Sequence, residues 1–270
     1  MINLDVCTLI ITGCISPYTE QNNLYVKNSK ERLVQYIGSI EFYITKSLFK
    51  NIIFCESSAY DYEDKKRLLS LAESLGKKFE WISFKGSKNV IEKGKGYGEG
   101  EVIKYAFENS ELICTSQFLI KVTGRLIISN INNIVRKMNN EIIYFNNDIY
   151  RSKGIDTRFY GCTCGFYCKN LRDLFKLSNE KLSEMTLEDV FYDYMHNAKI
   201  EYSCLPEYPR FIGVCGGNGK HYDKESKFKI GILSLLCRLH IMNCIYDIIA
   251  YVYRKIKVLR GYSGYRAERL

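Results

Sequence analysis

The sequence of 270 residues contains little proline, histidine or tryptophan, with three, three and one of each. It also lacks low-complexity segments and internal repeats. These absences exclude a solenoid, and nothing in the composition marks a disordered linker. Because 46% of the residues are hydrophobic, the chain is able to bury a sizeable core. We therefore expect one large domain or one domain with an appendage.

Several common motifs are absent as well. The chain contains no G-x-x-x-x-G-K-[ST] phosphate loop and no G-x-G-x-x-G dinucleotide fingerprint. No uninterrupted apolar stretch approaches the roughly 20 residues that a membrane-spanning helix needs. These observations argue against a P-loop nucleotidase, a dinucleotide-dependent oxidoreductase and a transmembrane anchor.

The 11 cysteines do not form the pattern of a disulfide framework. Many lie inside apolar runs, and the chain shows no signal peptide, so we expect a reducing cytoplasm. Cys162, Cys164 and Cys168 are close in sequence, but they include no C-x-x-C and no partner pair at zinc-finger spacing. We therefore expect no metal site there.

Alternating apolar runs and helical patterns predict an α/β fold. Residues 7–13, 51–57 and 79–84 read as buried strands, and helical patterns follow the first two of them. Residues 118–131 and 141–148 predict a fourth and a fifth strand, and residues 155–167 a strand that crosses near their ends. Short connections of this kind favour a mainly parallel sheet covered by helices on both faces. In such sheets, ligands bind beyond the carboxyl ends of the strands.

A stretch rich in glycine and lysine, residues 94–107, predicts a loop that leads into a helix. Four of its first seven residues are glycine, which allows the backbone to approach a ligand closely. Lys93 and Lys95 add positive charge beside a helix N-terminus, where anions are stabilised. The pattern therefore predicts a phosphate site, although a surface turn before a helix is the alternative.

Seven short motifs, together with the first predicted strand, span roughly residues 7–222: NIIFCESS, FEWISFKG, KGKGYGEGEVIKYAF, KVTGR, DTRF, LEDVFYDYM and PRFIGVCGGNGKHY. In their order and spacing, which carry most of the weight, the chain resembles the bacterial glycosyltransferases of capsule, lipopolysaccharide and O-antigen synthesis that have a GT-A-like, Rossmann-like nucleotide-sugar domain. The resemblance implies transfer of a sugar from a nucleotide-sugar donor, with a UDP-sugar favoured, to a lipid-linked glycan acceptor.

One departure from the GT-A pattern concerns the metal. Lys121-Val122-Thr123-Gly124-Arg125 stands where these enzymes usually place an Asp-x-Asp that holds a divalent ion. We therefore expect that no metal is required. Lys121 or Arg125, with Lys93 and Lys95, would instead offset the charge on the leaving diphosphate. Asp148 and Asp156 are weaker metal candidates, since single acids at strand ends more often serve in turns.

The resemblance also implies a set of substrate-binding residues, drawn from the predicted strand ends and glycine loops. Glu99 is equally well explained as an acid in the first turn of its helix. A plain exposed turn is the alternative for the later glycine loop, residues 213–222. The donor-binding residues are Thr12, Gly13, Pro17, Glu56, Asp61, Lys93, Lys95, Gly96, Tyr97, Gly98, Glu99, Lys121, Thr123, Gly124, Arg125 and Asp156. The acceptor or loop residues are Arg158, Gly216, Lys220, His221 and Tyr222.

An inverting transfer needs a carboxylate that takes the proton of the acceptor hydroxyl. Asp189 is the expected base and Glu188 its orienting partner or substitute. Thr186 would cap a helix and leave both acids in its first turn. The alternative is that these acids only meet the helix dipole.

Most of the net charge of +9 lies near the end of the chain. From Lys227 onward, nine Lys or Arg face two acids. Apolar residues recur there at helical spacing, and residues 228–259 predict a long helical region. We divide the chain into a catalytic domain, residues 1–226, and a basic amphipathic region, residues 227–270.

The basic region suits an anionic membrane surface, so we expect a peripheral protein on the inner face of the plasma membrane. Packing on the protein's own core, or on a partner in a homodimer, is the alternative. A non-catalytic scaffold of a polysaccharide-assembly complex is the rival function. A nucleic-acid-binding protein, suggested by the charge and 22 tyrosines, is less favoured because no such motif is present.

Overall fold

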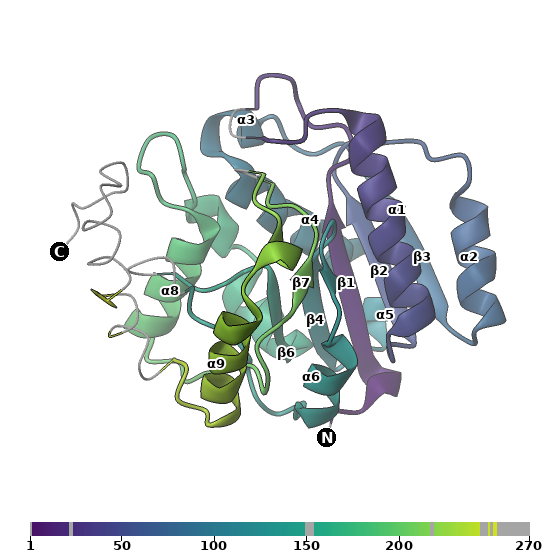
Figure 1. Cartoon of the computed structure of the whole chain (residues 1–270). Helices are drawn as coiled ribbons and strands as arrows, with labels where there is room; N and C mark the ends of the chain where they lie inside the picture. Colours follow the sequence, from purple (N-terminus) through teal and green to yellow (C-terminus); the bar gives the residue numbers. More distant parts are fainter. Residues whose placement is uncertain are drawn as a thin grey trace.

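The computed structural model describes residues 2–21, 24–148, 154–216, 219–243, 248 and 251–252. Its centre is a five-stranded sheet in the order β3-β2-β1-β4-β6. The first four strands in this order are parallel, and β6 is antiparallel to β4. The predicted α/β fold with a mainly parallel sheet is therefore confirmed (Figure 1).

The apolar runs of the sequence form the central strands. Every residue of β1 and β2 is buried, as expected of strands covered on both faces. β3 lies at an edge of the sheet and is only partly buried. A separate two-stranded sheet joins β5 and β7. The strands are Cys7–Gly13 (β1), Asn51–Glu56 (β2), Lys78–Ser83 (β3), Phe118–Thr123 (β4), Ile127–Ile128 (β5), Phe159–Thr163 (β6) and Phe211–Ile212 (β7).

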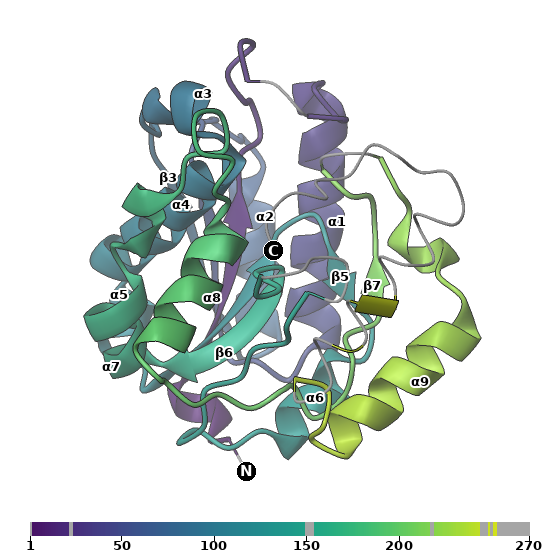
Figure 2. The ribbon, with the colours of Figure 1, turned by 90° about the vertical axis from the view of Figure 1, so that its left-hand side faces the viewer.

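Helices cover both faces of the sheet (Figure 2). One hydrophobic core lies between the sheet and α1, α2 and α6, and a second between the sheet and α4, α5 and α8. In the described ranges, no helix has the length and apolar character needed to cross a bilayer. The α-helices are Ser29–Lys46 (α1), Lys65–Ser74 (α2), Asn89–Lys93 (α3), Lys95–Asn109 (α4), Glu111–Cys114 (α5), Ile131–Lys137 (α6), Cys164–Phe166 (α7), Leu187–Asn197 (α8) and Lys227–Arg238 (α9).

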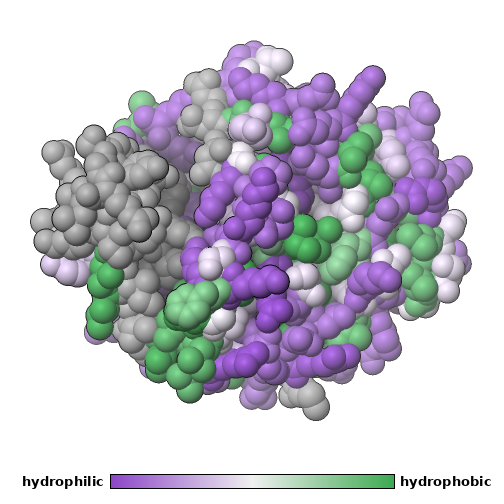
Figure 3. Space-filling model, in the orientation of Figure 1, coloured by the Kyte–Doolittle hydropathy of each residue, from purple (hydrophilic) through white to green (hydrophobic). Residues whose placement is uncertain are grey.

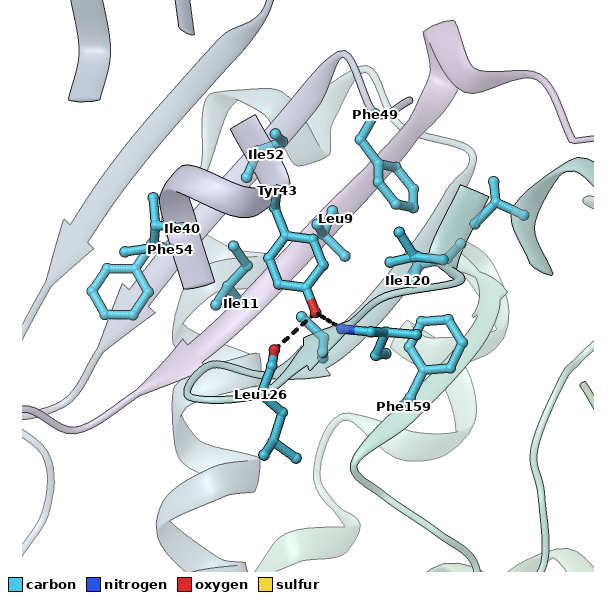
Figure 4. Packing of buried hydrophobic residues seen from close by; sticks show 14 of the residues in the cluster. Leu9, Ile11, Ile40, Tyr43, Phe49, Ile52, Phe54, Ile120, Leu126 and Phe159 are labelled. Atoms are coloured by element: carbon cyan, nitrogen blue, oxygen red, sulfur yellow. Dashed lines mark hydrogen bonds between the residues drawn. The ribbon is translucent and has the colours of Figure 1, made fainter. Parts of the chain in front are cut away.

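Tyr43 of α1 connects the first core to the turn after β4 (Figure 4). Its ring is fully buried. The hydroxyl donates to the C=O of Leu126 at 2.8 Å and accepts from the N–H of Ile128 at 3.0 Å. Burial raises the pKa of Tyr43, so the phenol stays neutral and able to donate. These bonds hold α1 against the segment that follows the candidate site.

The glycine-rich stretch does not form the loop that the sequence predicted. Gly96, Gly98 and Gly100 lie within α4. A Cβ added at Gly100 would lie 2.1 Å from the Cβ of Phe175, and one at Gly96 would lie 2.9 Å from the backbone nitrogen of Leu187. Two of these glycines therefore allow close packing between α4 and the segments that cover it.

Three further predictions about strands need correction. The predicted strand at residues 118–131 ends at Thr123, and β5 and the start of α6 follow it. Residues 141–148 form isolated bridges instead of a strand: Tyr144 pairs with Gly161 on one side and with Ser203 on the other. Within residues 155–167, the strand is the shorter β6, and α7 follows it directly. The chain leaves the sheet there because Thr163 caps α7 by accepting from the N–H of Phe166.

The predicted long C-terminal helix is also shorter than expected. α9 ends at Arg238, and residues 239–243 are turns and irregular backbone. Leu233 and Cys237 pack on Cys204 and Tyr208 in a small third core. Residues 244–247, 249–250 and 253–270 lie outside the described residues. The division at residue 226 stays a prediction.

We predict opposite effects for alanine at two helical glycines. Gly100→Ala should lower the free energy of unfolding by about 1–3 kcal/mol, because its methyl group would overlap Phe175. Gly38→Ala in α1 is the matched control: apart from the backbone of α1 itself, no described atom lies within 4 Å of the added Cβ, so the better helix propensity should stabilise by about 0.5–1 kcal/mol. Urea unfolding of both variants checks this. Equal effects would contradict the packing described for α4.

Candidate functional site

The carboxyl ends of β1 and β4 mark the point where the strand order reverses. The N–H of Gly124 donates to the C=O of Thr12 at 2.9 Å. A Cβ at Gly124 would lie 2.2 Å from this same oxygen, so the close approach requires glycine. Two of the predicted donor-binding residues, Thr12 and Gly124, therefore meet where α/β sheets of this kind bind ligands.

A buried cluster of charged and hydroxyl groups lies at the end of β4. The Lys121 ammonium forms an ion pair with the Glu99 carboxylate from α4. It also donates to the C=O of Thr157 at 2.6 Å and to the Thr123 hydroxyl at 3.1 Å. The Thr123 hydroxyl in turn lies 3.2 Å from Glu99 Oε1. The structure thus joins Glu99, Lys121 and Thr123 in one network.

The predicted acid pair begins α8, as expected, and its two carboxylates differ in their contacts. Asp189 forms a capping box with Thr186: its Oδ2 accepts from the Thr186 N–H at 2.9 Å and from the Thr186 hydroxyl at 2.7 Å. Glu188 Oε1 instead accepts from the Thr157 hydroxyl at 3.2 Å. Glu188 is therefore connected through Thr157 to the cluster at the end of β4.

Arg125 lies beside the later glycine loop. Its Nη1 donates to Gln35 Oε1 of α1 at 2.9 Å. A Cβ at Gly216 would lie 2.5 Å from Arg125 Nη2, so this loop comes very close to the guanidinium. Burial lowers the pKa of Arg125, although an arginine stays charged at neutral pH. The contact brings a predicted donor residue and a predicted loop residue together.

Asp156, Arg158 and Tyr222 form a second group. Asp156 accepts from Arg158 Nε at 2.8 Å and from its Nη2 at 2.6 Å. The Arg158 guanidinium lies 4.4 Å from the ring centre of Phe211 and 5.0 Å from that of Tyr222. Burial raises the pKa of Tyr222, which keeps its hydroxyl neutral. The charges of this group are thus engaged with one another.

Glu56 is fully buried at the end of β2. Its carboxylate accepts from the N–H of Ser58 at 2.9 Å and from that of Tyr60 at 2.8 Å, and it contacts the Ser83 hydroxyl of β3. These bonds fix the turn after β2 to the end of β3. A role toward the base or ribose of a donor stays a prediction.

The glycine end of α4 is occupied by a carboxylate of the chain itself. Glu180 Oε1 accepts from the N–H of Gly96 at 2.7 Å, and a Cβ at Gly94 would overlap the Glu180 side chain. Lys93 donates to the C=O of Lys176 at 3.3 Å, and Lys95 is exposed nearby. The predicted phosphate-binding backbone is therefore in contact with an internal anion.

Other predicted residues are buried in the packing or lie at the surface. Gly13 is packed against Phe54, the Tyr97 hydroxyl accepts from Asn89, and Gly98 lies against Val90. Three exposed residues have polar partners close by in the sequence. These are Asp61 with Lys65, Lys220 with Glu225 and His221 with Asp223, while Pro17 is half-buried in the loop after β1.

Sequence reasoning did not assign a role to Thr157, Gln35 or Glu180. Thr157 lies inside the DTRF motif, so its position beside the site could have been predicted from the sequence. Gln35 and Glu180 carry no local signal, because each acts on a residue more than 80 positions away along the chain. Within the described ranges, no three Asp, Glu, His or Cys side chains come together to hold a metal ion.

No protein-family model and no curated protein matches the chain. A Desulfovibrio desulfuricans G20 structure described as a nucleotide-diphospho-sugar transferase is similar to it, with TM-score 0.47 and 12% identity over 74% of this chain and 79% of the other. A cytidylyltransferase of Leptospira borgpetersenii aligns with TM-score 0.40 and 11% identity over 95% of each chain. At such identities the likeness concerns the fold alone.

Proposed function

We propose that this protein transfers a sugar from a nucleotide-sugar donor to a hydroxyl group of a glycan acceptor. The proposal depends on one observation: three of the motifs behind the family resemblance meet at the carboxyl end of β4. Lys121 of KVTGR donates to the C=O of Thr157 in DTRF. The Thr157 hydroxyl donates to Glu188 of LEDVFYDYM at 3.2 Å. Residues far apart in sequence thus build one polar site at the switch point of the sheet.

The reaction proposed is an inverting transfer. Asp189 takes the proton of the acceptor hydroxyl, which attacks the anomeric carbon while the nucleotide diphosphate leaves from the opposite face. Glu188 orients the acceptor or replaces Asp189 as base, and Thr157 fixes its carboxylate. Arg125, at the switch point, stabilises the charge that develops on the leaving diphosphate. In this proposal a UDP-sugar is the donor, and the acceptor is a lipid-linked glycan of bacterial surface polysaccharide.

A donor panel tests this function. We expect one of the UDP-, dTDP-, GDP- or CMP-sugars to release its nucleotide in the presence of a lipid-extracted acceptor, and EDTA to leave the rate unchanged. The measurement is nucleotide release with and without EDTA. A rate lost in EDTA and restored by manganese would contradict the metal-independent role of Arg125. If no sugar of the panel were turned over or bound, that result would favour the non-catalytic scaffold.

Two variants of the capping box separate the catalytic role of Asp189 from its structural one. Asp189→Asn and Thr186→Ala should both weaken the cap of α8, and each should lower the free energy of unfolding by about 0.5–2 kcal/mol. Thr186→Ala keeps the Asp189 carboxylate, so it should retain transfer. Asp189→Asn should lose at least about 100-fold in kcat while donor binding is kept. Equal activity of the two variants, measured beside their unfolding free energies, would assign Asp189 to the cap alone.

We further propose that α9 attaches the protein to an anionic membrane. Phe228, Ile232 and Leu235 are spaced along one face of the helix, and Leu239 is its C-cap residue; 45% to 79% of each is exposed. Lys227 and Arg238 lie at its two ends. Hydrophobic atoms gather over α9 in the space-filling view (Figure 3). An apolar stripe with flanking basic groups suits the boundary of anionic lipid headgroups.

A vesicle assay tests this attachment. The full chain should bind vesicles that contain anionic lipid more tightly than neutral ones, and Leu235→Glu should weaken binding by at least about tenfold through lost apolar burial and charge repulsion. Val34→Glu in α1 is the matched control, because Val34 is also exposed but belongs to another face. Sedimentation with vesicles measures both. Unchanged binding by Leu235→Glu would remove α9 from the contact.

A further inference from the structure

Lys121 is a buried cation whose donors are used inside the protein. Its side chain has 0% exposure and lies in register with Ile10 of β1. The ammonium contacts the Glu99 carboxylate, the C=O of Thr157 and the hydroxyl of Thr123. Because an ammonium group has three N–H donors, these three contacts use all of them. None is left for the phosphate oxygens of a donor.

Stability alone does not explain this ion pair. Removing an ammonium from water is strongly unfavourable, and apolar residues of similar volume often stabilise a protein as well as a buried pair or better. Two neighbours of Lys121 on this face of the sheet, Leu119 of β4 and Ile10 of β1, are apolar and belong to the same core. What the pair provides is a fixed place for the Glu99 carboxylate.

Glu99 lies between this core and the surface. Its side chain is 22% exposed, in contrast to that of Lys121. The bonds to Lys121 and Thr123 both involve Oε1. Thr123 is the last residue of β4, so the carboxylate lies at the edge of the sheet where a ligand is expected.

We propose that Lys121 is a positioning residue that holds Glu99, and that Glu99 accepts hydrogen bonds from hydroxyl groups of the transferred sugar. The proposal rests on the proposed function and specifies which part of the donor this cluster recognises. A carboxylate that already receives charge-assisted bonds is well suited to accept further hydrogen bonds from hydroxyl groups. In this arrangement Lys121 acts through Glu99 and does not touch the diphosphate.

Calorimetric titration with two probes tests the proposal: UDP and UDP-glucose, or the corresponding pair for the donor found active. The variants are Lys121→Met and the double variant Glu99→Gln with Lys121→Met. The double variant avoids an unpaired buried ammonium, which would threaten the fold of Glu99→Gln alone. We expect both to bind UDP within about twofold of the unmodified protein. Both variants should bind the nucleotide sugar about 10- to 100-fold more weakly than the unmodified protein does, because hydrogen bonds to a charged group are lost.

Glu101→Gln is the matched control from the same helix, since Glu101 accepts from the N–H of Ser87, away from β4. It should bind both probes normally. Loss of UDP binding in Lys121→Met would overturn the proposal and make Lys121 a diphosphate ligand. Normal binding of the sugar by the double variant would also overturn it. If the unmodified protein bound neither probe of any pair, the proposed function itself would fail, and this role of Glu99 with it.

Discussion

The structure depends on how the buried end of β1 satisfies its backbone polar groups. β1 lies at the centre of the sheet, and all seven of its residues are buried. The N–H of Gly124 donates to the C=O of Thr12, and the N–H of Ser57 donates to the C=O of Gly13 at 3.1 Å. Unpaired backbone polar groups cost free energy when they are buried. The segments that follow β2 and β4 therefore both pass over the carboxyl end of β1. The candidate site lies where they do.

The sequence predicted the central strands correctly, because a local pattern of apolar residues is sufficient to identify them. The runs that form β1 and β2 are short, apolar and bounded by turn residues, so they predicted buried strands. Residues 141–148 have a similar composition, but Tyr144 makes only isolated bridges to Gly161 and Ser203. The glycines of α4 were misread for a different reason: they allow close packing, as of Gly100 against Phe175, and such a tertiary contact leaves no local pattern in the sequence.

The local structure around the candidate residues was more predictable than their tertiary contacts. Thr186, Glu188 and Asp189 were placed correctly because capping is a local pattern. The separation of the two acids, one bonded to its own cap and the other to Thr157, depends on a tertiary contact across 31 positions. The pairing of Lys121 with Glu99 is likewise tertiary, since a lysine within a strand is no sign of a buried ammonium.

The carboxylate of Glu180 at the N-terminus of α4 has a consequence for anions in solution. A group held on its own chain competes at an effective concentration that commonly reaches the millimolar range or more. A free phosphate that sought the N–H of Gly96 would have to displace Glu180, while Lys93 and Lys95 remain nearby to attract it. The glycine end of α4 would therefore respond to anions only at high concentration or when a larger ligand binds elsewhere on the protein at the same time.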